Sequence, residues 1–186
     1  MSIRTFVAID TPEVVRSTML DVQSKLKVSG ADVKWEGPEK FHATIKFLGN
    51  VGEELLPSII DTIAQSVKNF PAFEASYTNV GCFPSVKRPR VIWIGCENTD
   101  GTLLRIKDIL DQALLPLGFE REERAFHPHV TLGRTKSPKG LNNLISILES
   151  FTFEPRTFTC NEILLMKSAL KSQGSEYTRL HSFALS

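Results

Sequence analysis

The stretch "FHATIKFLG" (residues 41–49) starts a run of alternating apolar and polar residues with a histidine. Much later in the chain, "HPHVTLGR" (residues 127–134) repeats this arrangement. Successive side chains of a β-strand point to opposite faces, so each run predicts a strand with one apolar face and one polar face. The apolar faces are suited to a protein core, and the polar faces are suited to a cleft.

Each polar face carries a histidine followed two residues later by a threonine. The first pair is His42 with Thr44, and the second is His129 with Thr131. A single His-x-Thr is more often a strand residue satisfied by a hydrogen bond, and short motifs of this kind arise by chance. The matched pair, each within its own apolar alternation, instead indicates two polar faces that meet in one cleft.

Strict alternation also assigns the neighbouring residues to faces. It places Phe47 on the core face and Lys46 beside His42, where Lys46 is either a second phosphate ligand or a solvated lysine. It places Arg134 on the other face of its strand from His129 and Thr131. A glycine in a strand often marks a bulge, so Gly133 could return Arg134 to the polar face.

Four helices are predicted from apolar residues that recur at helical spacing. They start at Thr11-Pro12 with Thr11 as the N-cap, after Gly52, near Asp100, and at Ser137-Pro138. Strand-like runs fall between them, so the order strand, helix, histidine strand, helix, strands occurs twice. This crude internal duplication predicts an α+β fold with antiparallel or mixed sheets.

Composition bounds the function. The 186 residues carry a net charge of +1, which is too small to bind long nucleic acid by overall electrostatic attraction. An anionic partner must therefore be recognised by a local group of residues. The sequence shows neither a signal peptide nor an apolar stretch long enough for a bilayer. Three cysteines without zinc-site spacing are typical of free thiols in a reducing compartment. We expect a cytoplasmic protein with no membrane contact.

A third histidine raises the question of a metal. His127 and His129 have the spacing of a two-histidine ligand pair, but a metal site needs a third or fourth ligand. The downstream histidine, His181, has no acidic or cysteine partner near it in sequence. We therefore expect no metal, and we interpret His127 as a rim residue.

Two imidazoles with ordinary pKa values near 6.5 can act at neutral pH as a base and an acid. Displacement at phosphorus suits this pairing, because one group activates the attacking oxygen while the other protonates the leaving oxygen. The hydroxyls of Thr44 and Thr131 could stabilise the charge that builds on the non-bridging oxygens. Arg134 could add a charge-assisted contact.

The two motifs resemble the signatures of the two-histidine phosphoesterase superfamily. They are most similar to its bacterial and archaeal RNA 2′,3′-cyclic phosphodiesterase branch, historically called 2′-5′ RNA ligase. The stretches "RTFVAIDTPE", "GCFPSVKRPRVIWIG" and "ILLMKSALKSQGSEYTRLHSFAL" extend the likeness over nearly the whole chain. The resemblance implies one bilobal, pseudo-twofold α+β domain over residues 1–186. Each lobe would be an antiparallel sheet with helices outside, and the cleft would lie between the lobes.

The resemblance also implies roles. His42 is the proton donor, His129 is the proton acceptor, and the residues that hold the phosphate are Thr44, Thr131 and Arg134. The implied reaction opens a terminal 2′,3′-cyclic phosphate with water and leaves a 2′-phosphomonoester, without cofactor or metal. The substrates would be RNA ends or small nucleotides that bear the cyclic phosphate.

The loop "CFPSVKRPR" combines Phe83 with three cations, among them Arg88. An aromatic ring beside basic residues is a plausible platform for a base and its phosphates, although a plain surface loop fits the same composition. Two other functions stay open: the reverse reaction, a 2′-5′ ligation of transfer-RNA halves, and a non-catalytic nucleotide-binding module. We expect a monomer.

Overall fold

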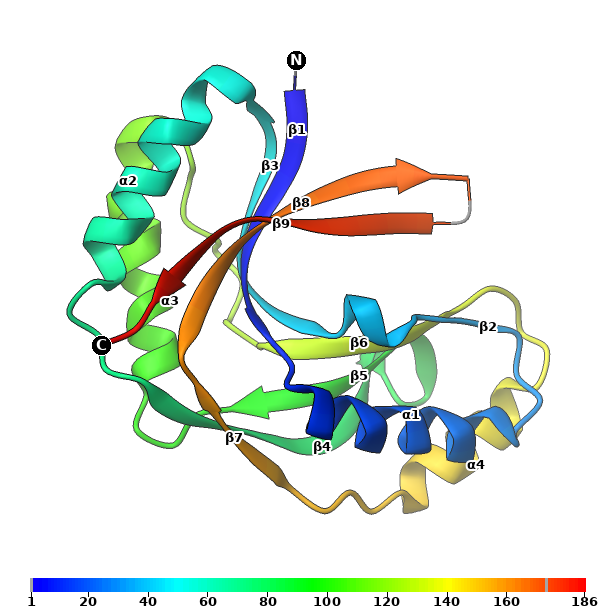
Figure 1. Cartoon of the computed structure of the whole chain (residues 1–186). Helices are drawn as coiled ribbons and strands as arrows, with labels where there is room; N and C mark the ends of the chain where they lie inside the picture. The colour runs from blue at the N-terminus through cyan, green and yellow to red at the C-terminus, as the bar shows by residue number, and fades with distance from the viewer. Residues whose placement is uncertain (1, 173) are drawn as a thin grey trace.

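The computed structural model describes residues 2–172 and 174–186 as two β-sheets that face each other, with helices on their outer sides (Figure 1). The strands are β1 (Ser2–Asp10), β2 (Val33–Trp35), β3 (His42–Gly52), β4 (Phe73–Ser85), β5 (Arg88–Glu97), β6 (His129–Thr135), β7 (Arg156–Cys160), β8 (Glu162–Lys171) and β9 (Gly174–Ala184). The helices are α1 (Glu13–Lys27), α2 (Leu56–Val67), α3 (Thr102–Ala113) and α4 (Leu141–Ser150), with short 3-10 turns η1 (Pro38–Lys40), η2 (Glu53–Leu55) and η3 (Leu115–Leu117).

Both sheets are antiparallel, which confirms the predicted α+β class. Sheet A has the strand order β3-β1-β8-β9, and sheet B has the order β2-β6-β5-β4-β7. The order β3-β1-β8-β9 corresponds to β6-β5-β4-β7, so each sheet carries one histidine strand in an equivalent place. The lobes are not the two consecutive halves of the chain, however, because β8 and β9 complete the sheet that β1 begins.

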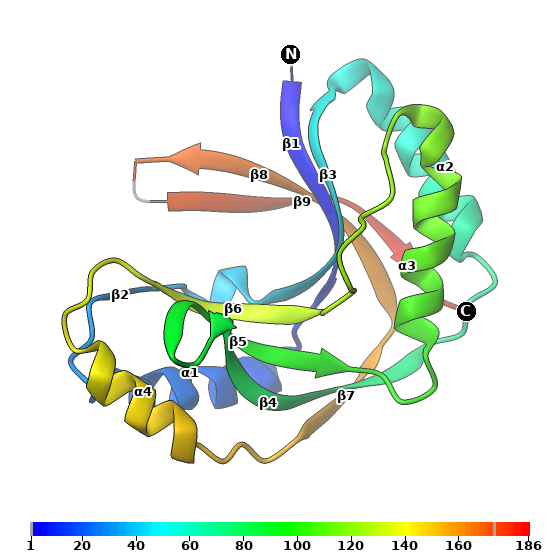
Figure 2. The same cartoon turned by 180° about the vertical axis from the view of Figure 1, so that it is seen from behind.

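The helices lie on the outer sides of the sheets. Helices α2 and α3 pack beside each other behind sheet A, while α1 and α4 cover the outer side of sheet B (Figures 1 and 2). Helix α2 buries Ile59, Ile63 and Val67 at four-residue spacing, as its periodicity predicts. In α3, Leu103, Ile106 and Leu110 are buried, whereas the apolar side chain of Leu104 is 48% exposed.

The start of the first helix also differs from the prediction. Pro12 is the N-cap residue of α1, and no side chain caps this end. Thr11 does not cap, because its hydroxyl shares a 2.6 Å hydrogen bond with the phenol of Tyr77 in sheet B. A contact 66 residues away in sequence therefore takes the group that local chemistry assigns to the helix end.

Candidate active site

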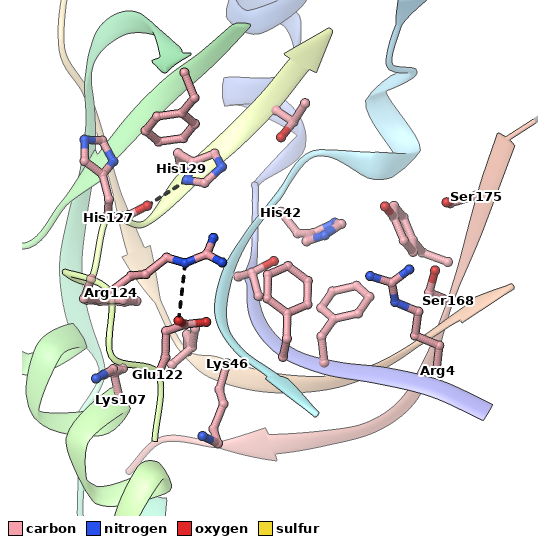
Figure 3. Close-up of a pocket in the computed structure, with 18 of the residues that line it drawn as sticks. Arg4, His42, Lys46, Lys107, Glu122, Arg124, His127, His129, Ser168 and Ser175 are labelled. Atoms are coloured by element: carbon pink, nitrogen blue, oxygen red, sulfur yellow. Dashed lines mark hydrogen bonds and ion pairs between the residues drawn. The ribbon is translucent and has the colours of Figure 1, made fainter. Parts of the chain in front are cut away.

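A cleft of about 770 Å³ lies between the two sheets. Its lining includes His42 and Thr44 from β3 and also His129 and Thr131 from β6. Figure 3 shows His42 on one side of this cleft and His129 on the other. The structure thus brings both predicted histidine–threonine pairs to one cavity.

Arg134 also lines the cleft, because β6 contains a bulge. In the pairing of β5 with β6, Trp93 lies opposite Thr131 and Ile92 lies opposite Gly133, so Leu132 is an extra residue without a partner. The extra residue shifts the alternation by one position and returns Arg134 to the face of the catalytic candidates. The strict alternation was therefore wrong here, and the bulge considered at Gly133 lies one residue earlier.

Strand β3 contains the same irregularity. Val7 lies opposite Lys46 and Ala8 lies opposite Thr44, so Ile45 is the extra residue. As a consequence, Phe47 is not a core residue: its side chain lies in the cleft lining and is 62% exposed.

Lys46 changes face for the same reason. Its ammonium, whose side chain is 2% exposed, lies 2.5 Å from Asp111 Oδ1 and donates a 2.7 Å hydrogen bond to the carbonyl of Glu120. Both alternatives for Lys46 are thus wrong, because it is neither solvated nor free to bind a phosphate.

The ring of His129 is held in one tautomer. Its Nδ1 lies 2.7 Å from the carbonyl oxygen of His127, and a carbonyl can only accept, so Nδ1 carries the hydrogen. The lone pair of the neutral ring is then on Nε2. Burial, the largest cause, lowers the pKa of His129 below its ordinary value. A neutral imidazole with a fixed acceptor nitrogen is suited to act as a base.

His42 has a more apolar environment. Its ring stacks on Phe6 with centroids 4.8 Å apart, and the ring of Tyr177 meets it edge-on at 4.8 Å. Burial lowers the pKa of His42 to about 4, although the carboxylate of Asp10 opposes this shift. A phosphate anion beside the ring would favour its protonated form, which an acid requires.

Arg134 is loosely held. Its Nε lies 3.8 Å from Glu36 Oε1, and its side chain is 55% exposed. Glu36 also makes a 3.1 Å ion pair with Lys40. A half-exposed guanidinium with one long ion pair can turn toward an anion in the cleft.

The structure separates the two residues predicted in the basic loop. Phe83 lines the cleft, and its ring centroid lies 5.0 Å from that of His129. Arg88 is exposed near the end of the β4–β5 hairpin, where it pairs with Ser85, and it does not belong to the cleft lining. Phe83 is therefore placed to contact a substrate, whereas Arg88 is not.

Several cleft residues escaped the sequence analysis. Tyr177 and Phe6 surround His42, and Arg4 lies near them. Trp93 is buried outside the cleft lining and supports the ring of His127, with centroids 4.7 Å apart. Tyr177 lies far from His42 in the sequence, so no local pattern could have indicated it. The rim interpretation of His127 agrees with its place in the cleft lining.

Within residues 2–172 and 174–186, no group of three or more histidine, cysteine or acidic side chains is arranged to hold a metal ion. No helix in the same ranges has both the length and the hydropathy that a membrane span requires.

Comparisons with known proteins place the chain in a family. Residues 28–171 match the family model of the 2′-5′ RNA ligase superfamily. The chain is 34% identical over 186 residues to an RNA 2′,3′-cyclic phosphodiesterase of Methanothermobacter thermautotrophicus, covering 100% of both chains. It is 34% identical over 179 residues to the protein of that name in Thermotoga maritima, covering 96% of this chain and 93% of that one.

A solved structure agrees. The crystal structure of TT0787 of Thermus thermophilus superposes with a TM-score of 0.80 at 27% identity, covering 98% of this chain and 97% of that one. Family model, full-length relatives and fold point the same way: this chain is a member of the 2′-5′ RNA ligase superfamily.

Proposed function

We propose that the chain is an RNA 2′,3′-cyclic phosphodiesterase that opens a terminal cyclic phosphate with water to give a 2′-phosphomonoester. One observation carries this proposal: two imidazoles from different sheets, each with a threonine two residues on, line a single cleft. Binding alone would not require two titrating groups. The names of the full-length relatives support the same reaction.

In the proposed mechanism His129 acts as the base. Its Nε2 accepts a proton from a water molecule while the water oxygen forms a bond to phosphorus. The hydrogen bond from Nδ1 to the carbonyl of His127 supports this role, because it orients the ring and stabilises the imidazolium that forms.

His42 acts as the acid. As the bond from phosphorus to O3′ breaks, its imidazolium gives a proton to O3′, and the bond to O2′ stays intact. The product is a 2′-phosphomonoester with a free 3′-hydroxyl. The anionic substrate itself would raise the pKa of His42 from its low value and so favour the acid form.

The phosphate is bound by Thr44, Thr131 and Arg134. The two hydroxyls donate hydrogen bonds to the non-bridging oxygens, where negative charge grows in the transition state. Arg134 adds a charge-assisted bond from the same side as His129. Phe83, beside His129, offers a ring for the base of the terminal nucleotide.

The proposal extends to the form in which the protein acts. The two sheets share the cleft and each supplies one histidine, which supports a single bilobal domain that works as a monomer. The free thiols of Cys82, Cys96 and Cys160 support a reducing compartment such as the cytoplasm. Size-exclusion chromatography with light scattering tests the monomer. Ligation of transfer-RNA halves, the reverse reaction, would be tested by incubating 2′,3′-cyclic phosphate ends with 5′-hydroxyl ends.

The test of the main reaction is hydrolysis of a short RNA with a 2′,3′-cyclic phosphate in water enriched in ¹⁸O. The proposal predicts one labelled oxygen in a 2′-phosphomonoester, identified by ³¹P NMR and mass spectrometry. A 3′-phosphomonoester would contradict the assignment of the leaving oxygen. An inert wild-type protein would contradict the activity.

A further inference from the structure

A second aromatic and basic surface lies beside His42. It consists of Arg4, Phe6, Phe47, Ser168 and Tyr177, and we refer to it as the sheet A surface. All five residues line the cleft. Figure 3 shows Arg4 and Ser168 on the side of His42 that faces away from His129. Phe6 and Tyr177 pack against the ring of His42, but the proposed hydrolysis gives no role to Arg4, Phe47 or Ser168.

The strand pairing builds the surface as two neighbouring rows. Arg4 lies opposite Ser168, and Ser168 lies opposite Tyr177, so these three residues cross β1, β8 and β9 side by side. Phe6 lies opposite Phe47 in the adjacent row. Arg4 precedes Phe6 by two residues on the same face of β1, about 7 Å further along the strand.

The exposed groups of this surface suit a nucleotide. Phe47 is 62% exposed although it lies within the cleft, and its ring centroid is 6.1 Å from that of Phe6. Arg4 is exposed and forms no ion pair with any residue of the described ranges. An aromatic ring that can stack on a base, next to a free guanidinium that can pair with a phosphate, is the chemistry of single-stranded RNA recognition.

The proposed reaction determines which nucleotide would reach this surface. Water attacks from the His129 side, so O3′ leaves on the His42 side. In ribose, C3′ is bonded to C4′, which carries C5′, whereas the base is attached to C1′ next to C2′. The 5′ end of the terminal nucleotide is therefore directed toward sheet A, and its base is directed toward Phe83.

We propose that Arg4 and Phe47 form a subsite for the penultimate nucleotide of an RNA end. Phe47 stacks on its base, and Arg4 binds the phosphate that joins it to the terminal nucleotide. This inference rests on the proposed function, because it uses the direction in which O3′ leaves. It makes an RNA end at least two nucleotides long a better substrate than a mononucleoside cyclic phosphate.

The test compares a mononucleoside 2′,3′-cyclic phosphate with a 5′-hydroxyl dinucleotide that has the same terminal nucleoside and cyclic phosphate. Arg4→Gln and Phe47→Leu should each lower kcat/KM for the dinucleotide about 10-fold, mainly through KM. Both should leave the mononucleoside reaction within about 2-fold, since it makes no contact with the subsite. Equal effects on the two substrates, or none on either, would overturn the proposal.

Two variants serve as comparisons. Arg88→Gln removes an exposed arginine outside the cleft, so it should not change the preference between the substrates; a change equal to that of Arg4→Gln would mean that only overall charge matters. Phe83→Leu should lower kcat/KM for both substrates by the same factor, because the ring of Phe83 is assigned to the terminal base.

A binding measurement separates this inference from the activity. Isothermal calorimetry gives the Kd of a dinucleotide with a terminal 2′-phosphate and of the matching mononucleoside 2′-phosphate, without turnover. Wild type should prefer the dinucleotide, and Arg4→Gln and Phe47→Leu should each reduce that preference about 10-fold. If wild type bound both equally, the subsite would be wrong even if the hydrolysis were correct. If wild type were inert yet preferred the dinucleotide, the hydrolysis alone would be wrong.

Discussion

Ile45 in β3 and Leu132 in β6 occupy equivalent positions: each is an extra residue that its neighbouring strand leaves unpaired, directly after the threonine of its own strand. Both side chains are buried, at 5% and 0% exposure. Each bulge turns the residue two places further on, Phe47 or Arg134, into the cleft. The site is thus symmetric in its histidines and threonines but carries an aromatic ring on one side and a guanidinium on the other.

The side chain of Gln23 is hydrogen-bonded to the bulge in β6. Its side-chain amide is buried in α1 and donates hydrogen bonds to the carbonyls of Leu132 (2.9 Å) and Glu36 (2.7 Å). Gln23→Leu should lower the free energy of unfolding by about 1–3 kcal/mol, because it removes the amide donor from the carbonyl of Glu36 and leaves the carbonyl of Leu132 with only the backbone N–H of Glu36. Urea unfolding measures this loss. The control is Gln112→Leu at an exposed position of α3, and a loss of the same size there would contradict the explanation.

The threonine hydroxyls can be tested by shape-preserving substitution. Thr131→Val and Thr44→Val remove one donor each and should lower kcat for hydrolysis of the cyclic phosphate about 10²-fold, since such donors act on charge that develops in the transition state. Thr→Ser at either position keeps the hydroxyl and should retain most of the rate. If the valine variants kept wild-type kcat, the hydroxyls would not contact the phosphate.

The pH dependence follows from the low pKa values of the two histidines. In the free enzyme burial lowers the pKa of His42 to about 4 and also lowers that of His129. The midpoints of both limbs in the profile of kcat/KM against pH should therefore lie below pH 6.5. A bound phosphate anion raises the pKa of His42, so the alkaline limb of kcat should lie at higher pH. Steady-state kinetics between pH 4 and 9 measures both profiles. Coincident alkaline limbs would show that the substrate does not stabilise protonated His42.

Lys46 is predicted to matter for stability. Asp111 is fully buried between Lys46, at 2.5 Å, and Lys107, at 2.8 Å. Lys46→Met should lower the free energy of unfolding by about 3–5 kcal/mol, because it leaves the buried carboxylate of Asp111 with one cationic partner instead of two. Lys107→Met keeps the more buried ion pair, between Lys46 and Asp111, and should lower the free energy of unfolding by less. Denaturant unfolding of both variants decides this, and equal losses would contradict the assignment.

Much of the site could be predicted from the sequence, because the relevant pattern is local. Alternation over a few residues places His42 with Thr44, and His129 with Thr131, on polar faces. The bulges could not be predicted in the same way, since they depend on β1, β5 and α1. The glycine after Leu132 gave a hint for β6, but the residue after Ile45 is Lys46, whose partner Asp111 lies 65 positions away.

The fold also combines features that the local sequence predicts with features that depend on long-range pairing. Helix α2 follows from its own apolar spacing, and so does the antiparallel class from the runs of strands. The assignment of strands to sheets depends on long-range pairing, which places β8 beside β1. Tyr177 reaches His42 only through that pairing, so its contact with the ring had no signal in the sequence.

The central claim, that His42 is the acid and His129 is the base, is tested most directly by changing the leaving group. The measurement is the single-turnover rate, in EDTA, of wild type, His42→Ala and His129→Ala on two substrates. One is an RNA end with a 2′,3′-cyclic phosphate, and the other is a 3′-deoxynucleoside 2′-(4-nitrophenyl phosphate), whose leaving nitrophenolate needs no proton. Both variants should lose at least about 10²-fold on the RNA end. On the nitrophenyl ester His42→Ala should recover most of its rate while His129→Ala stays slow. Recovery of His129→Ala instead would reverse the roles, and equal loss of both variants on both substrates would contradict acid–base catalysis by this pair.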